Sequence, residues 1–313
     1  MSTTRRRLLT YALVAACVSC ARPVVAGPPT LDAARAYGYL QKICRLGPRP
    51  SGSRGMSEQQ TLIAEHFTRL GAQVGFQSFD AADPLSGKPV RMSNLIVTWH
   101  PKMPDRVFIC CHYDTRPFPD RDRRNPRGVF VGANDGASGV ALLMELGNHM
   151  HDLTVSRGVD FIFFDGEELV YQDQGKYFLG STYFAQQYRD SPPPYQYAAG
   201  VLVDMVGDKD LDLFPEKTSV RLAPGVTQSI WAVAKSLKIK EFHQTPRHEI
   251  SDDHIPLNEI ARIPTCDVID FDYPYWHTAM DVPSRCSGES LVKVGKVLLR
   301  WLTLPPGKQS PPQ

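Results

Sequence analysis

The sequence has little net charge. Its 313 residues include 35 Lys and Arg against 33 Asp and Glu, which gives a formal charge of +2. A protein that binds nucleic acid normally carries a basic surplus, so this balance argues against a nucleic-acid partner. We therefore interpret the arginine-rich stretch RDRRNPR, residues 121–127, as a solvated loop.

A hydrophobic run long enough to span a membrane, roughly 20 residues, is also missing. The apolar stretch from Leu8 to Val18 is shorter, follows three arginines, and leads to small residues up to Ala26. This pattern is typical of a cleavable secretory signal, so we predict that residues 1–26 direct export to the periplasm or the extracellular space. Cleavage there would remove four arginines and no acidic residue, which changes the formal charge from +2 to −2.

The type of signal stays open. Thr4, followed by three arginines and two leucines, resembles the start of a twin-arginine signal, which exports folded proteins. Val14, Ala15 and Ala16 before Cys17 fit a lipoprotein cleavage site instead, and Cys17 would then carry a lipid anchor to the cell envelope.

Cys-x-x-Cys spacing does not occur after residue 26, so a structural zinc site of the finger type is not expected. The cysteines in that part are Cys44, Cys110, Cys111, Cys266 and Cys286. An exported protein can form disulfides, but an odd count leaves at least one thiol unpaired within the chain. The pairing stays open, although the apolar run VFICC favours buried thiols at its two cysteines.

Hydrophobic periodicity predicts helices and strands in alternation. Apolar residues recur at three- and four-residue spacing over 31–46 and 56–70, which predicts two amphipathic helices. The predicted strands that follow are AQVGFQSF, NLIVTWH, RVFICCH, VDFIFFD, AAGVLVDM and PTCDVIDF. Further helical patterns cover residues 137–149, 182–188, 227–237 and 291–302. This alternation favours an α/β fold whose sheet is mostly parallel in its centre.

The chain shows neither an internal repeat nor a Pro/Ser-rich linker that would divide it. We therefore predict a single domain over residues 27–304. The closing stretch PPGKQSPPQ, residues 305–313, is predicted to be a disordered tail.

Polar side chains follow three of the predicted strands. His112 and Asp114 follow the third strand, Asp165 to Glu168 follow the fourth, and Asp204 follows the fifth. In open α/β sheets ligands bind beyond the carboxyl ends of the strands, so we expect these residues to meet at one edge. Glu167 and Glu168 are neighbours, and on an extended chain their side chains point to opposite sides. One carboxylate could then hold a metal while the other moves protons.

Two further residues complete the candidate set, Asp135 in GANDGASG and His277 in YWHTAMD. Imidazole and carboxylate without thiolate is the ligand set of a catalytic zinc site, although other divalent ions use it too. Each residue alone has an ordinary alternative, such as a helix N-cap for Asp135. GANDGASG is not interpreted as a phosphate loop because it lacks the GK[ST] ending.

The order of these motifs resembles a known family. HYD, GANDGASGVALLMEL, FFDGEE, VLVDM and a late HT followed by Asp281 resemble the zinc-dependent M28 peptidase family, from about Tyr37 to Leu299. Within it, SDDHIPL at residues 251–257, LVDMVG and the Trp276–His277 pair resemble glutaminyl-peptide cyclotransferases. The resemblance implies a single-domain, three-layer α/β/α fold of the zinc aminopeptidase type with a mixed, centrally parallel sheet.

The resemblance also implies a role for each site residue. Asp135, Glu168 and His277 would hold one zinc ion per chain, and Glu167 would be the general acid/base. The aminopeptidases of the family bind a second zinc through two further residues, which correspond to His112 and Asp204. The family's cyclases keep both positions while binding a single zinc, so their presence leaves the number of metals open.

In a cyclase, Asp204 would lie near the substrate amine, and Asp253 would join it in a polar network. Trp276 would form an apolar wall of the glutamine pocket. Two departures from the family pattern concern Tyr171 and Asp267. Some cyclases have a second pocket tryptophan where this chain reads LVYQDQG, so Tyr171 is a candidate replacement, and animal cyclases have a histidine at the position of Asp267.

The implied activity is conversion of N-terminal glutamine to pyroglutamate with release of ammonia. Its partners would be peptides or proteins with a free N-terminus. A two-zinc aminopeptidase is the alternative, and it would release free amino acids. A non-catalytic binding domain is a more remote alternative, because the expected ligands and the base are all present.

Overall fold

The computed structural model describes residues 30–172 and 174–309, and the predicted export signal and Cys17 lie outside these residues. From Leu31 onward the chain forms one compact unit. No helix within the described ranges is long and apolar enough to cross a membrane.

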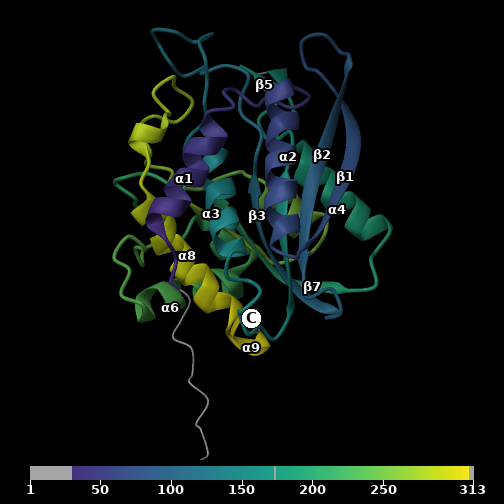
Figure 1. Ribbon diagram of the computed structural model, residues 1–313, viewed down its shortest axis with the longest axis vertical. Helices are drawn as coiled ribbons and strands as arrows, with labels where there is room; N and C mark the ends of the chain where they lie inside the picture. The colour runs from purple at the N-terminus through teal and green to yellow at the C-terminus, as the bar shows by residue number, and fades with distance from the viewer. Residues whose placement is uncertain (1–29, 173, 310–313) are drawn as a thin grey trace, which may run out of the picture. The chain divides into compact units, whose positions relative to one another are not determined.

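A six-stranded mixed sheet forms the centre of this unit (Figure 1). In spatial order its strands are β1 (Gln73–Ala82), β2 (Pro89–Trp99), β4 (Gly158–Phe164), β3 (Asp105–His112), β7 (Gln196–Asp204) and β8 (Thr265–Ile269). The β4, β3, β7 and β8 strands run parallel to one another, whereas β1 pairs with β2 and β2 with β4 in antiparallel fashion. The predicted α/β class with a centrally parallel, mixed sheet is confirmed.

Helices cover both faces of the sheet. One face carries α1 (Ala33–Cys44), α2 (Arg54–Arg69), α3 (Ala137–Gly147), α6 (Pro224–Ser236) and α8 (Gly288–Leu302). In Figure 1, α1, α3 and α8 lie side by side on this face. The opposite face carries α4 (Leu179–Asp190) and α7 (His254–Glu259). The result is the predicted three-layer α/β/α arrangement.

Alternation along β3 shows how the strand serves both layers. Ile109 and Cys111 pack into the core below the first group of helices, whereas Phe108 and Cys110 pack into the core below α4 and α7. Successive strand residues point to opposite faces, so a strand buried on both sides reads as one continuous apolar run. The five cysteines of the described chain are free and buried. Burial raises the pKa of Cys44 to about 12, which makes that thiol unreactive.

The prediction of a disordered tail is wrong for residues 305–309. Pro306–Gln309 form a short helix, α9, and Gln309 is buried. Its side chain donates a hydrogen bond to the carbonyl oxygen of Trp301, and its own carbonyl accepts one from the hydroxyl of Ser229. Polar main-chain and side-chain bonds, rather than apolar periodicity, hold this segment. Residues 310–313 lie outside the described part of the chain.

Several short elements were not predicted from the sequence, because two to six residues are too few to show a hydrophobic periodicity. They are α5 (Lys217–Leu222), α7, the 3-10 helix Pro283–Arg285, and the hairpin of β5 (Val170–Tyr171) and β6 (Gln174–Gly175). Two of them border the site described next.

Candidate metal centre

The candidate residues meet at the carboxyl edge of β4, β3 and β7, which are neighbours in the sheet. His112 is the last residue of β3 and Asp204 the last residue of β7. Glu167 and Glu168 follow β4 after a short turn. Asp135 comes from the loop before α3, and His277 from the loop after β8.

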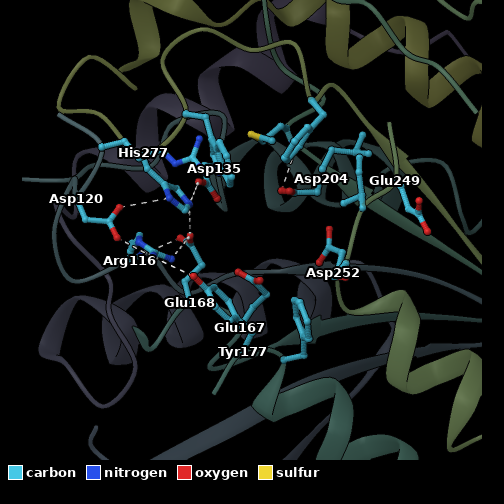
Figure 2. A pocket seen from close by; sticks show the side chains of 18 of the residues that line it. Arg116, Asp120, Asp135, Glu167, Glu168, Tyr177, Asp204, Glu249, Asp252 and His277 are labelled. Atoms are coloured by element: carbon cyan, nitrogen blue, oxygen red, sulfur yellow. Dashed lines mark hydrogen bonds and ion pairs between the residues drawn. The ribbon is translucent and has the colours of Figure 1, made fainter. Parts of the chain in front are cut away.

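Asp135, Glu168 and His277 come together as one group (Figure 2), with donor atoms that lie within 4.8 Å of one another. The Nε2 atom of His277 is 2.8 Å from Glu168 Oε1 and 3.5 Å from Asp135 Oδ2. All three residues are buried. This is the triad that the sequence predicted for one metal ion.

His112, Asp135 and Asp204 form a second group that shares Asp135 with the first. The Nε2 atom of His112 is 3.1 Å from Asp204 Oδ1 and 3.3 Å from Asp135 Oδ1. Asp135 therefore lies between the two histidines with one carboxylate oxygen towards each. Both groups predicted from the sequence are present as geometry.

The loop that carries Asp135 is fixed by Asp281, which accepts hydrogen bonds from the backbone N–H groups of Asn134 and Asp135. Gly136 follows with φ of 95°, a conformation that disfavours residues with a side chain. A Cβ at this position would lie 2.7 Å from the carbonyl oxygen of Asp114. Glycine is thus required for the loop to bring Asp135 beside His112.

The turn that carries Glu167 and Glu168 leaves the extended conformation at Gly166, whose φ is 74°. Asp114 holds the turn, because its two carboxylate oxygens accept the backbone N–H groups of Glu167 and Glu168. Both glutamates line the same cavity, so the prediction that they point to opposite sides is wrong. They differ instead in the histidine that each one approaches. Glu168 lies against His277, and Glu167 Oε2 is 3.9 Å from Nδ1 of His112.

A ring of contacts that the sequence did not reveal supports His277. Its Nδ1 atom lies 3.4 Å from Asp120 Oδ1, and the other oxygen of Asp120 accepts a hydrogen bond from Arg116 at 2.7 Å. Arg116 also reaches back to Glu168, with its backbone N–H at 2.9 Å and its guanidinium at 3.5 Å. Burial alone would raise the pKa of Asp120, but His277 and Arg116 lower it to about 2. The backbone of His277 has φ of 55°, which is rare for a residue other than glycine and indicates a position held by its surroundings.

The site has the character of a cation-binding site. The carboxylates of Asp135, Glu168 and Asp204 are buried close together, which is unfavourable without compensating positive charge. Asp135 Oδ2 is buried and accepts no hydrogen bond from the described residues, although it lies between donor atoms of the triad. Each group offers three ligand atoms from imidazole and carboxylate, which matches a catalytic zinc site with an open coordination position.

The triad lines a cavity of about 540 Å³, a size suited to a small ligand or the end of a peptide. Trp276 is part of its wall, together with Ile250, Ile269 and Phe271. Tyr171 is not, and the prediction that it lines this cavity is wrong. It contributes instead to an adjoining cavity of about 340 Å³, because the β5–β6 hairpin turns it towards Phe118.

Tyr177 lines the main cavity in its place, and its hydroxyl accepts a hydrogen bond from Arg116 at 3.1 Å. Five residues lie between the two tyrosines, and no periodic pattern in that stretch distinguishes them.

Acidic residues also form the wall opposite His277. Asp252 lines the cavity with Asp204, and Figure 2 shows both carboxylates beside it. Asp253 lies behind this wall, where it accepts a hydrogen bond from Ser181. Burial, together with the charges of Asp204 and Asp253, raises the pKa of Asp252 well above its ordinary value. Of the two neighbouring aspartates, the one that faces the cavity is therefore the one the sequence did not select. Asp267 is fully buried, with Oδ2 3.9 Å from His254 Nδ1.

The pKa values of Glu167 and His277 are both raised. Burial raises the pKa of Glu167 well above its ordinary value, and Glu168 and Asp252 add to the rise while His112 opposes it. Burial lowers the pKa of His277, but Glu168 and Asp120 outweigh burial and raise it to about 9. A bound cation would lower both values, because it disfavours the added proton.

Comparison with known proteins places this geometry in a family. The model of peptidase family M28 matches residues 94–302. The chain is 27% identical over 302 residues to the glutaminyl-peptide cyclotransferase-like protein of Mus musculus, covering 87% of this chain and 76% of that protein.

Solved structures with a similar fold include enzymes named as glutaminyl cyclases and as Zn-dependent exopeptidases. A glutaminyl cyclase from Fimbriiglobus ruber superposes with a TM-score of 0.86 at 41% identity, covering 90% of this chain and 99% of that one. A Zn-dependent exopeptidase from Parabacteroides distasonis superposes with a TM-score of 0.82 at 28% identity, covering 89% and 100%. Since the family model spans the strands of the parallel centre together with Asp135, Glu168 and His277, the chain belongs to peptidase family M28.

Proposed function

We propose that this protein is a zinc-dependent glutaminyl-peptide cyclotransferase, which converts the N-terminal glutamine of peptides to pyroglutamate and releases ammonia. The observation that carries the proposal is the cavity at the triad. It brings an acid/base candidate, Glu167, and an aromatic wall, Trp276, to the same small space as Asp135, Glu168 and His277. The similarity to the Fimbriiglobus ruber cyclase, at 41% identity over nearly the whole of that chain, supports the same choice.

One zinc ion per chain would be held by Asp135, Glu168 and His277. When bound, it would supply Lewis acidity towards the side-chain amide oxygen of the substrate glutamine. The outer contacts of His277 favour this group over the one around His112. A metal-bound histidine normally donates its other ring N–H to an oxygen, and Asp120 offers one to His277. The Nδ1 atom of His112 lies farther from its nearest carboxylate oxygen, at 3.8 Å from Asp114, than the 3.4 Å between His277 and Asp120.

The chain's own residues would then orient the substrate and move one proton. Asp204 would accept a hydrogen bond from the α-amine and direct it towards the side-chain amide carbon. Trp276 would pack against the side chain of the glutamine. The amine and its target belong to the same residue, so orientation alone contributes strongly, up to about 7–11 kcal/mol when the geometry is right.

Glu167 would accept a proton from the amine nitrogen as the new N–C bond forms. It would deliver that proton to the amide nitrogen as the old C–N bond breaks, so that ammonia leaves. Burial raises the pKa of Glu167 above its ordinary value, which suits a carboxyl group that must both take and give a proton.

The test is mass spectrometry of the purified protein with two matched peptides, one beginning with glutamine and one with leucine. We expect loss of one ammonia from the first and no change in the second. Shortening of the leucine peptide by one residue would support the two-zinc aminopeptidase instead. We also propose that the mature protein is exported, which N-terminal sequencing of material from the periplasm and the medium would test.

A further inference from the structure

Arg121, at the start of the arginine-rich loop, lies on the wall of the main cavity. Its guanidinium lies 3.8 Å from the centroid of the Trp276 ring, a cation–π contact. Its backbone N–H donates a hydrogen bond to the carbonyl oxygen of His277 at 3.1 Å. The loop is therefore attached to the same segment that supplies the metal-binding histidine.

A second attachment fixes the loop. Asp122 accepts hydrogen bonds from the backbone N–H groups of Arg124 and Asn125 within the loop, and from that of Ala279 outside it. These contacts give Arg121 a fixed position beside the cavity, unlike that of a freely solvated side chain.

The charge of Arg121 is not used inside the protein. Arg116, the other arginine of the cavity wall, is paired with Glu168 and Asp120. Arg121 forms no ion pair with any acidic side chain in the described ranges, although acidic groups dominate the rest of the wall. A planar guanidinium stacked on an aromatic ring keeps its N–H edge free for a carboxylate.

Arg127 borders a second cavity at the other end of the loop. It lines the adjoining cavity, which shares Asp120 and Gln172 with the main one. It too is exposed and has no ion pair within residues 30–172 and 174–309. The two arginines therefore border two neighbouring cavities that share a wall, as they would along the path of an extended peptide.

We infer that Arg121 is a specificity-determining residue that binds an acidic side chain at the second position of the peptide. Arg127 extends the same preference to the third position. The inference rests on the proposed function, because it concerns the residues that follow the N-terminal glutamine. Glu249 also lines the main cavity, but it forms no ion pair with an arginine within the described residues. It therefore does not neutralise Arg121.

The experiment uses peptides that begin with glutamine and carry Glu, Ala or Lys at the second position. For the unchanged protein we expect kcat/KM to be about tenfold higher with Glu than with Lys at low salt, mainly through KM. The preference should shrink in 0.5 M NaCl because partly exposed charges are screened. Mass spectrometry should record both loss of ammonia and loss of a whole residue, so that the preference is measured under either chemistry.

The variants are Arg121→Gln, Arg121→Lys and, as a matched control, Arg123→Gln. Arg123 is an exposed arginine of the same loop that lines neither cavity. We expect Arg121→Gln to bring the Glu/Lys ratio close to one, Arg121→Lys to keep part of it, and Arg123→Gln to leave it unchanged. Zinc content and thermal unfolding should be measured for each variant to detect misfolding.

An unchanged ratio in Arg121→Gln would overturn the inference, as would the absence of any preference in the unchanged protein. An equal loss in Arg123→Gln would replace a specific contact with a general effect of charge. Arg127→Gln should reduce a preference for Glu at the third position and spare that at the second. If no peptide is cyclised but leucine peptides are shortened, the proposed function fails while the preference at the second position is still tested.

Discussion

The two histidine groups around Asp135 differ in what lies behind them. His277 belongs to a closed ring in which Asp120, Arg116 and Glu168 support one another. His112 approaches Asp204 with one nitrogen, while its other nitrogen lies 3.8 Å from Asp114 and is unpartnered. Two groups with almost the same ligand types are thus unequally prepared to hold a metal. We therefore expect outer contacts, rather than ligand identity, to decide which of the two groups holds a metal.

The largest effect should come from removing His277, with His112 as the comparison. We expect His277→Ala to reduce bound zinc from about one ion per chain to less than about a tenth of that, with loss of measurable turnover. His112→Ala should keep the ion, because Asp135, Glu168 and His277 and their outer contacts remain. Elemental analysis of both variants by mass spectrometry measures this. Equal loss of zinc in both would mean that the two groups bind metal together, as in the aminopeptidase alternative.

A second prediction separates the two glutamates that follow β4. Glu167→Gln should keep zinc and lower kcat by about 10²–10⁴-fold, since a glutamine cannot carry the proton. Glu168→Gln is the matched comparison, and it should lose zinc because this residue faces His277. Metal content and single-turnover rates decide the matter. Zinc loss in Glu167→Gln with retention in Glu168→Gln would reverse the two assignments.

The third prediction weakens the ring without touching a ligand. Asp120→Asn should lower zinc affinity by about 10- to 100-fold, because a neutral amide holds His277 and Arg116 less strongly than a carboxylate. Asp80→Asn is the control, since Asp80 pairs with exposed Arg91 on the outer strands. Competition with a coloured chelator gives the affinities. If Asp120→Asn binds zinc as well as the control, the ring is not what distinguishes the two groups.

The meeting of the candidate residues at this site could be predicted from the sequence, whereas the ring of contacts behind His277 could not. Asp135, Glu168 and His277 stand in short motifs at strand ends or near glycines, and the sheet edge gives a physical reason for them to meet. Asp120 and Arg116 lie in a loop without periodicity, and the partners that tie them to the site, His277 and Glu168, are at least 52 residues away. Such contacts depend on the course of a loop through space, which no local pattern encodes.

The same limit explains the errors at the cavity wall. Asp252 and Asp253 are adjacent, and the sequence does not show which one faces inward. Tyr171 lies in the two-residue strand β5 and Tyr177 follows β6, and elements this short carry no periodicity that would give the directions of their side chains. Long strands and helices were predicted because burial gives them a repeating pattern. Segments of two to six residues, such as α7 and β5, are held by tertiary contacts and carry no such signal.

A fourth prediction uses the pKa of His277, which is about 9. Zinc binds the neutral imidazole, so below that pH the metal must displace a proton. Affinity should therefore fall by about tenfold for each pH unit between 8 and 6. Asp120→Asn should flatten this pH dependence of zinc affinity, because losing the carboxylate lowers the pKa of the His277 imidazole. A flat profile in the unchanged protein would show that His277 is already neutral and that the ring does not raise its basicity.

The smallest effect should come from Tyr177, which contacts the ring from outside through Arg116. Tyr177 is 43% exposed, and its hydroxyl accepts one hydrogen bond from Arg116. Water can replace that acceptor, so Tyr177→Phe should change zinc affinity by less than about threefold, measured with the same chelator. The aromatic ring of residue 177 remains in the cavity wall in this variant. A change in KM would therefore reflect the lost hydroxyl and not lost packing. An affinity loss as large as that of Asp120→Asn would mean that support for His277 extends as far as the solvent-exposed rim.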